Sequence, residues 1–359
     1  MKRILIITTR QIGDVLLTTP LVRASRERWP LARIEVLGFE GTLGMLHGNA
    51  DIDALIPTPA RLGIGGIWLL LRRLWRQYDL ALVAQPGDRS HLIGWAAARL
   101  RSGIVPAESG SNWWKARLLD HVVVSAGDQG AVHVVQENLA LLAPWSNGAA
   151  LTAQVVPPPA AALPAGLDAQ IQPLSVAVHV PSMWRYKQWP VEHFKVLVQG
   201  LLDRGHQVLL TGSNGERDQG CIAPLRALAT APRLIDTSGK LNFNQLTALL
   251  QRVTLYIGPD TSVSHLAAAS GVPVVAIFGP TNPMRWAPWP ASAASKAGFA
   301  RASLVQHNGN VTLLQNNLPC VPCGKAGCEN HRDSRSDCLD AITPERVLQE
   351  ADRLLTRAS

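Results

Sequence analysis

The sequence lacks any apolar run long enough to cross a bilayer. Its longest such run, residues 64–71, contains two glycines and falls well short of the roughly 20 residues that a spanning helix needs. The first residues form a short β-branched run without an A-x-A cleavage site, so we expect no secretory leader. These absences argue against an integral membrane protein and predict a cytoplasmic one, which leaves open contact with a membrane surface.

Charged residues and low-complexity tracts are also scarce. Only 17% of the 359 residues are charged, whereas 47% are hydrophobic, which is the composition of a packed globular protein and not of a disordered one. Single cores seldom grow beyond roughly 250 residues. We therefore expect two domains.

Recognition motifs for nucleic acid are absent: no helix-turn-helix, zinc-finger or aromatic RNP pattern appears. There is no G-x-G-x-x-G fingerprint either. The net charge is nevertheless +8, which favours anionic partners such as nucleotides, phosphorylated glycans or acidic membranes. One stretch with only two acidic residues holds Arg61, Arg72, Arg73, Arg76, Arg89, Arg99 and Arg101. These arginines either bind an anionic acceptor or form a solvated helix face.

Apolar strand-like runs alternate with helical segments through the first half. Strands are predicted at 3–9, 33–39, 80–85 and 121–124, and helices at 14–28, 66–77 and 134–143. Such alternation predicts βαβ units and a parallel sheet that is buried on both faces.

A proline-rich segment, residues 156–166, then interrupts the pattern. It contains four prolines, which cannot continue a helix or a central strand. We therefore predict that it is a linker. After it, strands are predicted at 175–180, 206–212, 233–239, 254–259 and 274–280, with helices at 191–204 and 262–271. The chain is thus predicted to form two doubly wound Rossmann-like halves, with a cleft between the carboxyl ends of their sheets.

Asp14 follows the first predicted strand, in a Gly-Asp turn that opens a helix. It can serve as a catalytic carboxylate at the sheet's carboxyl end, or it can simply cap the helix. Lys187 stands among aromatic residues after the strand at 175–180; it is either a surface residue or a point charge that holds a diphosphate.

The segment 256–286 carries the most information. A strand runs into Asp260, Thr261 and Ser262, and a helix of small residues begins there with His265 in its first turn. Free N–H groups and hydroxyls at a helix N-terminus favour an anion. We therefore expect diphosphate binding here, although His265 alone would more often be a structural histidine.

Four ordered motifs make the chain resemble the glycosyltransferase family of the lipopolysaccharide core heptosyltransferases. They are G-D in the first turn, K-x-W-P-x-E-H-[FW], a G-S-x-x-E-like loop and G-x-D-[TS]-x-x-x-H-L-A-A-A, spread from residue 2 to about 350. The resemblance implies the GT-B fold. It also implies an acceptor domain at 1–158, an ADP-sugar domain at 159–342 and a C-terminal helix at 343–359 that crosses back to the first domain.

The resemblance also assigns roles by position. Asp14 is the implied catalytic base. The arginines expected to hold acceptor anions are chosen by the local charge excess and not by position: Arg61, Arg72, Arg73, Arg76 and Arg89. The implied donor residues are Ser182, Met183, Lys187, Gly212, Glu216, Leu241, Asp260, Thr261, Ser262 and His265. Met183 and Ser262 depart from the family pattern, which usually has a hydroxyl residue and a glycine there. Glu216 would meet the ribose and Leu241 the adenine.

Four cysteines gather near the end of the chain. Cys320, Cys323, Cys328 and Cys338 have the spacing C-x2-C-x4-C-x9-C, which is typical of metal or redox chemistry in a cytosolic protein. They bind a structural zinc or iron ion, or else they are reduced, packing thiols. Cys221 is expected to be buried.

The activity that the resemblance implies is inverting, metal-independent transfer of heptose from ADP-heptose to a sugar hydroxyl of the lipopolysaccharide core. The protein would act as a monomer, in the cytoplasm or at the cytoplasmic face of the inner membrane, with no nucleic-acid partner. Two alternatives stay open: heptose transfer to a protein of the autotransporter type, and a non-catalytic relative that only binds a sugar nucleotide.

Overall fold

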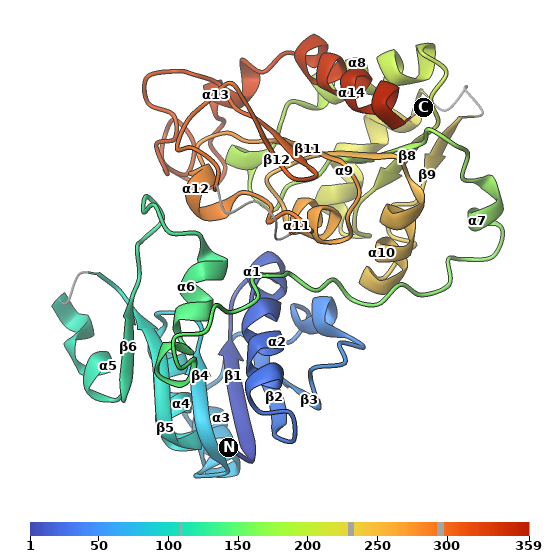
Figure 1. Cartoon of the computed structure of the whole chain (residues 1–359). Coiled ribbons are helices and arrows are strands. Elements are labelled where there is room, and N and C mark those ends of the chain that lie inside the picture. Colours follow the sequence, from blue (N-terminus) through green and yellow to red (C-terminus); the bar gives the residue numbers. More distant parts are fainter. Residues whose placement is uncertain (108–109, 229–232, 293–297, 359) are drawn as a thin grey trace. The chain divides into compact units, whose positions relative to one another are not determined.

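The computed structural model describes the whole chain except residues 108–109, 229–232, 293–297 and 359. The chain divides into two compact units, Met1–Pro158 and Pro159–Ser359, and the division falls inside the proline-rich segment. Both units are built on mainly parallel sheets, which confirms the predicted α/β class (Figure 1). Within the described residues, no helix is both long enough and apolar enough to cross a membrane.

The first unit is a six-stranded parallel sheet with the order β3-β2-β1-β4-β5-β6. Its central strands are fully buried, as Ile4–Ile7 of β1 show, because helices cover both faces. Helices α2 and α6 pack together on one face, and α3 and α4 on the other (Figure 1). The strands are β1 (Arg3–Thr8), β2 (Arg33–Phe39), β3 (Ala54–Thr58), β4 (Tyr78–Val83), β5 (Ala98–Val105) and β6 (His121–Val124). The helices are α1 (Ile12–Leu16), α2 (Thr19–Arg28), α3 (Ile64–Leu74), α4 (Asp88–Ala97), α5 (Trp113–Arg117) and α6 (Val134–Ala140).

The single helix predicted at 14–28 is in fact two helices, α1 and α2. Pro20 has no N–H to give to the carbonyl of Leu16 four residues earlier. The hydroxyl of Thr19 donates to that carbonyl instead, at 2.8 Å, and the hydroxyl of Thr18 donates to the carbonyl of Val15 at 2.6 Å. The Thr19 hydroxyl thus replaces the backbone bond that proline removes, and the chain turns between the two helices.

The second unit has a seven-stranded sheet with the order β12-β13-β11-β10-β7-β8-β9, in which only the β12–β13 pair is antiparallel. The strands are β7 (Val176–His179), β8 (Val208–Thr211), β9 (Leu234–Asp236), β10 (Leu255–Pro259), β11 (Val274–Ile277), β12 (Val305–Asn308) and β13 (Val311–Leu314). The helices are α7 (Leu167–Gln170), α8 (Val191–Asp203), α9 (Glu216–Arg226), α10 (Phe243–Arg252), α11 (Ser262–Ala269), α12 (Pro283–Trp286), α13 (Asp337–Asp340) and α14 (Pro344–Ala358).

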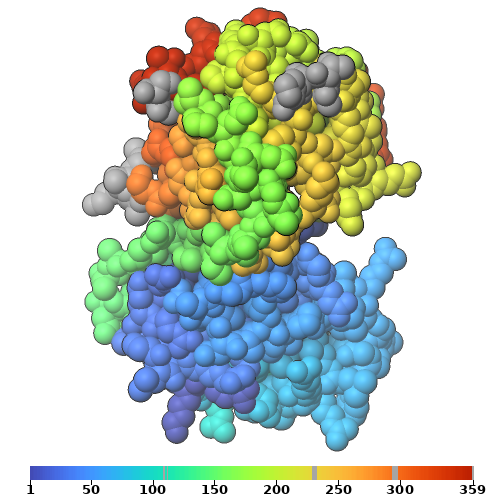
Figure 2. Space-filling model, turned by 90° about the vertical axis from the view of Figure 1, so that its right-hand side faces the viewer, coloured from blue at the N-terminus to red at the C-terminus, as the bar shows by residue number. Residues whose placement is uncertain are grey.

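From Pro159 on, the proline-rich segment lies on the surface of the second unit, along the start of α10 (Figure 2). The carbonyls of Pro159 and Ala162 accept hydrogen bonds from the side chains of Asn244 and Gln245, at 2.9 and 3.2 Å. Proline cannot donate to a sheet ladder, so such a segment is held through its carbonyls.

Helix α14 is grouped with the second unit. It packs on α8, and its apolar face (Val347, Leu348, Ala351 and Leu355) is part of the second unit's core. The fully buried Trp189 also donates its indole N–H to the carbonyl of Ile342, just before α14, at 2.9 Å. Burial of this face therefore holds the helix in the second unit.

A candidate nucleotide site and a candidate catalytic carboxylate

In each unit the strand order reverses at one point, and parallel sheets bind ligands beside the carboxyl ends of the strands at such points. In the first unit the reversal lies between β1 and β4, and in the second between β7 and β10. The segments that follow these four strands carry Asp14, Gln85, Lys187 and Asp260. Each unit thus carries two of these residues at its own reversal point.

In the second unit, an ion pair joins the two strands at the reversal. The Lys187 ammonium, after β7, lies 2.7 Å from a carboxylate oxygen of Asp260, after β10. That carboxylate also accepts a hydrogen bond from the Thr281 hydroxyl at 2.6 Å. Burial opposes ionisation of Asp260, but the charge and hydrogen bond of Lys187 outweigh it and lower the pKa of Asp260. The pair thus stays ionised although the Asp260 side chain is only 6% exposed.

The turn from β10 into α11 is fixed by close packing. The Ser264 hydroxyl donates to the carbonyl of Pro259 at 2.5 Å, and the Tyr256 hydroxyl lies 3.0 Å from the Ser264 hydroxyl. A Cβ at Gly258 would come within 2.3 Å of the Tyr256 hydroxyl, so only glycine fits there. This packing presents the amino end of α11 at the sheet edge, with Thr261 as the N-cap. Such an end attracts anions.

His265 lies in the first turn of α11 and is buried. Burial lowers the pKa of His265 to about 4, with the Asp260 charge opposing and the Lys187 charge adding to the shift. His265 is therefore neutral at pH 7. His179, at the end of β7, behaves in the same way: burial lowers its pKa to about 4, and its Nδ1 lies 3.0 Å from the Thr211 hydroxyl.

The loop before Lys187 is organised by Gln188, which the sequence did not point out. The Gln188 side chain accepts the backbone N–H of Ser182 at 2.8 Å and donates to the carbonyl of Val180 at 2.8 Å. Ser182 is buried, whereas Met183 is 44% exposed. The predicted residues Ser182 and Lys187 therefore belong to one hydrogen-bonded turn, while the Met183 side chain is exposed.

The two remaining loops of the predicted donor site adjoin each other. Glu216 begins α9 after β8, and Leu241 precedes α10 after β9. The backbone N–H of Gly239 donates to the carbonyl of Gly212 at 2.8 Å, which ties these loops together. The predicted donor residues thus come from the carboxyl ends of four neighbouring strands, β10, β7, β8 and β9. Glu216 is exposed and Leu241 is half-buried.

In the first unit, Asp14 lies in the first turn of α1, after β1. The N-cap residue is Gln11, so Asp14 is not the cap. Its carboxylate forms an ion pair with the Nε of Arg10 at 2.9 Å, and the Asp14 side chain is 15% exposed. Neither Arg10 nor the neighbouring polar groups were identified from the sequence.

A buried polar cluster stands at the same sheet edge. The Gln85 side-chain amide, after β4, donates to the hydroxyls of Thr9 and Ser90, which lie 2.9 Å apart. Thr9 follows β1 directly and Ser90 lies in α4. The cluster joins the ends of β1 and β4, so hydrogen bonds fix the sheet edge from which the chain continues to Asp14.

The arginines predicted to hold acceptor anions are not gathered beside Asp14. Helix α3 runs back from the end of β3 to the start of β4, so Arg72, Arg73 and Arg76 lie towards the amino edge of the sheet. The Arg76 guanidinium donates to the carbonyl of Ala98, where β5 begins, at 2.7 Å. An acceptor site that combines them with Asp14 is therefore not supported.

The Arg89 guanidinium is also hydrogen-bonded to other residues of the first unit. It donates to the carbonyls of Pro59 and Ala60 and to the hydroxyl of Thr58, at 2.9, 3.2 and 2.5 Å. Burial lowers the pKa of Arg89. This residue anchors the loop after β3. Of the five predicted arginines, only Arg61 is an exposed residue of that loop.

The cysteine cluster does not have the arrangement of a metal centre. Among the residues that the structure describes, no three His, Cys, Asp or Glu side chains are grouped so that they could hold a metal ion. Burial, followed by the proximity of Cys323, Cys328 and Cys320, raises the pKa of Cys338 to about 12. Without a bound metal, that thiol is therefore protonated at neutral pH. Cys221 is half-buried, not buried as predicted.

Comparisons with known proteins agree with this architecture. The structure of E. coli ADP-heptose lps heptosyltransferase II superimposes with a TM-score of 0.71 over 99% of both chains, at 22% identity. The curated relatives include lipopolysaccharide heptosyltransferase 3 of Escherichia coli, 27% identical over 77% of this chain and 83% of the relative. Lipopolysaccharide heptosyltransferase 2 of Escherichia coli (strain K12) is 27% identical over 98% of each chain.

The fold and the two strand-end sites define a GT-B protein with two Rossmann-like units. The family model of glycosyltransferase family 9 (heptosyltransferase) matches residues 67–304, about two-thirds of the chain. The protein belongs to this family, and the predicted resemblance is confirmed.

The buried neutral histidines generate a prediction about stability and pH. Because the unfolded chain binds a proton at His179 near pH 6.5 and the folded chain only near pH 4, stability falls as pH drops through this window. Between pH 7 and pH 5 the loss from His179 should be about 2 kcal/mol. Urea unfolding at both pH values should show a smaller drop for His179→Gln than for the wild type. Equal drops would contradict the assigned state of His179.

Proposed function

We propose that the protein transfers a heptose from ADP-heptose to a sugar hydroxyl of the lipopolysaccharide core. The observation that carries this proposal is the Lys187–Asp260 ion pair at the strand reversal of the second sheet, in a chain that belongs to the heptosyltransferase family. The names of the relatives supply the donor and the acceptor class.

The second unit would bind the donor. The Lys187 ammonium can turn from Asp260 towards a diphosphate, while the N–H groups at the start of α11 face the same edge. Both stabilise the negative charge that develops on the leaving ADP. Ser182, Thr261 and Ser262 border this edge, and the joined loops of Glu216 and Leu241 would hold the nucleoside. Asp260 would keep Lys187 in place until the donor arrives.

The first unit would bind the acceptor next to Asp14. The Asp14 carboxylate takes the proton of the acceptor hydroxyl while that oxygen bonds to the anomeric carbon. The bond from this carbon to the diphosphate oxygen breaks, and ADP leaves with the electron pair. Attack from the face opposite ADP inverts the anomeric configuration. Arg10 holds the Asp14 carboxylate through their ion pair. No metal takes part in this sequence, because Lys187 and backbone amides neutralise the diphosphate.

The direct test incubates the protein with ADP-heptose and a panel of truncated core glycans, in the presence of a chelator. Mass spectrometry should show the gain of one heptose by one glycan together with the release of ADP. The anomeric configuration of the new bond, read by NMR, should be opposite to that of the donor. If no glycan gains a heptose although ADP-heptose binds, the chain is a non-catalytic sugar-nucleotide-binding relative.

Asp14→Asn should lower the transfer rate by about 10²–10⁴-fold, because it removes the general base. The affinity for ADP-heptose should stay within a few-fold, since Asp14 is not a residue of the second unit. The matched control is Asp120→Asn, which changes a carboxylate at the start of β6, at the amino edge of the same sheet. A folded Asp14→Asn protein that transfers at the wild-type rate would remove Asp14 from the mechanism.

Lys187→Ala should weaken ADP binding about 10- to 100-fold in calorimetry, the loss expected for one charge-assisted hydrogen bond. Asp260→Ala should also weaken it, since it removes the buried carboxylate that positions the Lys187 ammonium. Lys195→Ala is the control, because Lys195 pairs with Glu192 on the exposed side of α8. If ADP affinity is unchanged in both site variants, the nucleotide binds elsewhere.

A further inference from the structure

Helix α3 presents large apolar side chains to solvent. Ile64, Trp68 and Leu69 are 91%, 56% and 60% exposed. They share one side of α3 with Arg72 and Arg73, which follow within a turn and are also exposed. We call these five residues the α3 outer face. Scattered apolar residues are common on protein surfaces, but a contiguous group of this size calls for a partner.

The opposite side of α3 is already used. Leu74 is buried in the first unit's core, and Leu70 and Leu71 pack against that core. The outer face is therefore not needed to hold the helix in place. Helix α3 is therefore apolar on both its inner and its outer side, and the fold of the first unit buries only the inner side.

The charges of the outer face are not compensated within the described part of the unit. None of the ion pairs between described residues involves Arg61, Arg72 or Arg73. The two nearest acids in sequence are engaged elsewhere: Asp79 accepts the backbone N–H groups of Lys2 and Arg3, and Asp88 pairs with Lys115 at 2.6 Å. The face thus combines exposed apolar groups with unneutralised positive charge.

The arginine and tryptophan side chains are arranged as at a lipid–water interface. The Arg72 guanidinium stacks over the Trp68 ring at 5.4 Å, and the Arg76 guanidinium stacks over the Trp75 ring at 5.5 Å. Stacked in this way, each pair offers an apolar body and a cationic tip. Trp and Arg take this arrangement where acyl chains meet headgroups.

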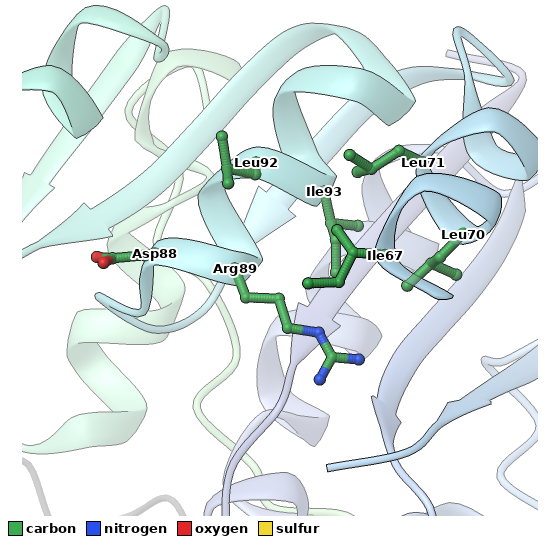
Figure 3. A pocket seen from close by; sticks show the side chains of 7 residues that line it. All are labelled: Ile67, Leu70, Leu71, Asp88, Arg89, Leu92 and Ile93. Atoms are coloured by element: carbon green, nitrogen blue, oxygen red, sulfur yellow. The ribbon is translucent and has the colours of Figure 1, made fainter. Parts of the chain in front are cut away.

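An apolar crevice lies beside the outer face, between α3 and α4 (Figure 3). Its volume is ≈ 240 Å³, and its lining is mainly the side chains Ile67, Leu70, Leu71, Leu92 and Ile93. Ile67 and Ile93 approach each other across it, whereas the Asp88 carboxylate points away (Figure 3). Leu92, at its edge, is 41% exposed. The crevice extends the apolar surface from α3 to α4.

We propose that the α3 outer face is a docking surface for an anionic lipid bilayer. Trp68, Leu69 and Ile64 would enter the headgroup boundary, and the arginines would bind the lipid phosphates. A second copy of the chain fits poorly, because it would bring Arg72 and Arg73 against the same charges. This proposal assigns a new role to arginines predicted to hold the acceptor glycan, and it does not depend on the activity proposed above.

The test is flotation of the full chain with vesicles. The wild type should bind vesicles that contain equal parts of phosphatidylglycerol and phosphatidylcholine. Binding should weaken when the salt concentration is raised or when the vesicles contain no phosphatidylglycerol. The double variants Trp68→Ser/Leu69→Ser and Arg72→Gln/Arg73→Gln should each weaken binding about tenfold or more.

Matched controls exclude general effects of hydrophobicity and charge. Leu31→Ser removes a 99% exposed leucine elsewhere on the first unit. Arg233→Gln/Arg357→Gln removes the same two charges from exposed sites of the second unit. Both should bind vesicles like the wild type. Equal binding by all variants, or no binding of the wild type to phosphatidylglycerol vesicles, would overturn the proposal.

Two further measurements separate the competing roles. In sedimentation velocity, the wild type should not form a dimer through this face. A wild-type dimer that dissociates in Trp68→Ser/Leu69→Ser would make the face a contact between copies and contradict the proposal. Transfer to a lipid-free glycan should be unchanged in Arg72→Gln/Arg73→Gln; a higher acceptor KM there would return the arginines to the acceptor site. If no glycan accepts heptose, the proposed activity is wrong. The vesicle experiment still tests the docking surface independently.

Discussion

The Lys187–Asp260 ion pair is the interaction on which the candidate donor site depends. It bridges the ends of β7 and β10, the two strands between which the second sheet changes direction. A buried charge is costly unless it is paired, and a buried pair adds little net stability. Its value is therefore geometric: it holds a lysine ammonium at the sheet edge where we propose that the diphosphate binds, with Thr281 and the α11 amino end beside it.

The rest of the second unit can be understood as support for this pair. Gly258, Tyr256 and Ser264 bring α11 close to the sheet, and Gln188 folds the turn that carries Lys187. The fully buried Trp189, which directly follows that turn, is bonded to the chain just before α14. The last helix thus braces the lysine loop from the opposite end of the sequence, which explains why it belongs to the second unit.

Much of this could be predicted from the sequence, because it depends on local patterns. Strand–helix alternation, the proline-rich segment and polar residues directly after buried strands predict Asp14, Lys187 and Asp260 at strand ends, where the structure has them. The roles of Gln188, Thr281, Gln85 and Arg10 could not be predicted, since each depends on which distant loop lies opposite. The arginines of α3 are predicted from their charge, which does not reveal that the helix runs back towards the amino edge of the sheet. Helix α14 packs on the core of the second unit through its apolar stripe.

The central claim is that ADP binds at the carboxyl edge of the second sheet, around Lys187 and Asp260. Hydrogen–deuterium exchange of the wild-type chain with and without ADP tests it most directly. The account predicts slower exchange in the segments 181–188 and 258–266, with a smaller effect at 212–217, and unchanged exchange in the first unit. Protection confined to the first unit, or to strands away from the β7–β10 edge, would contradict it.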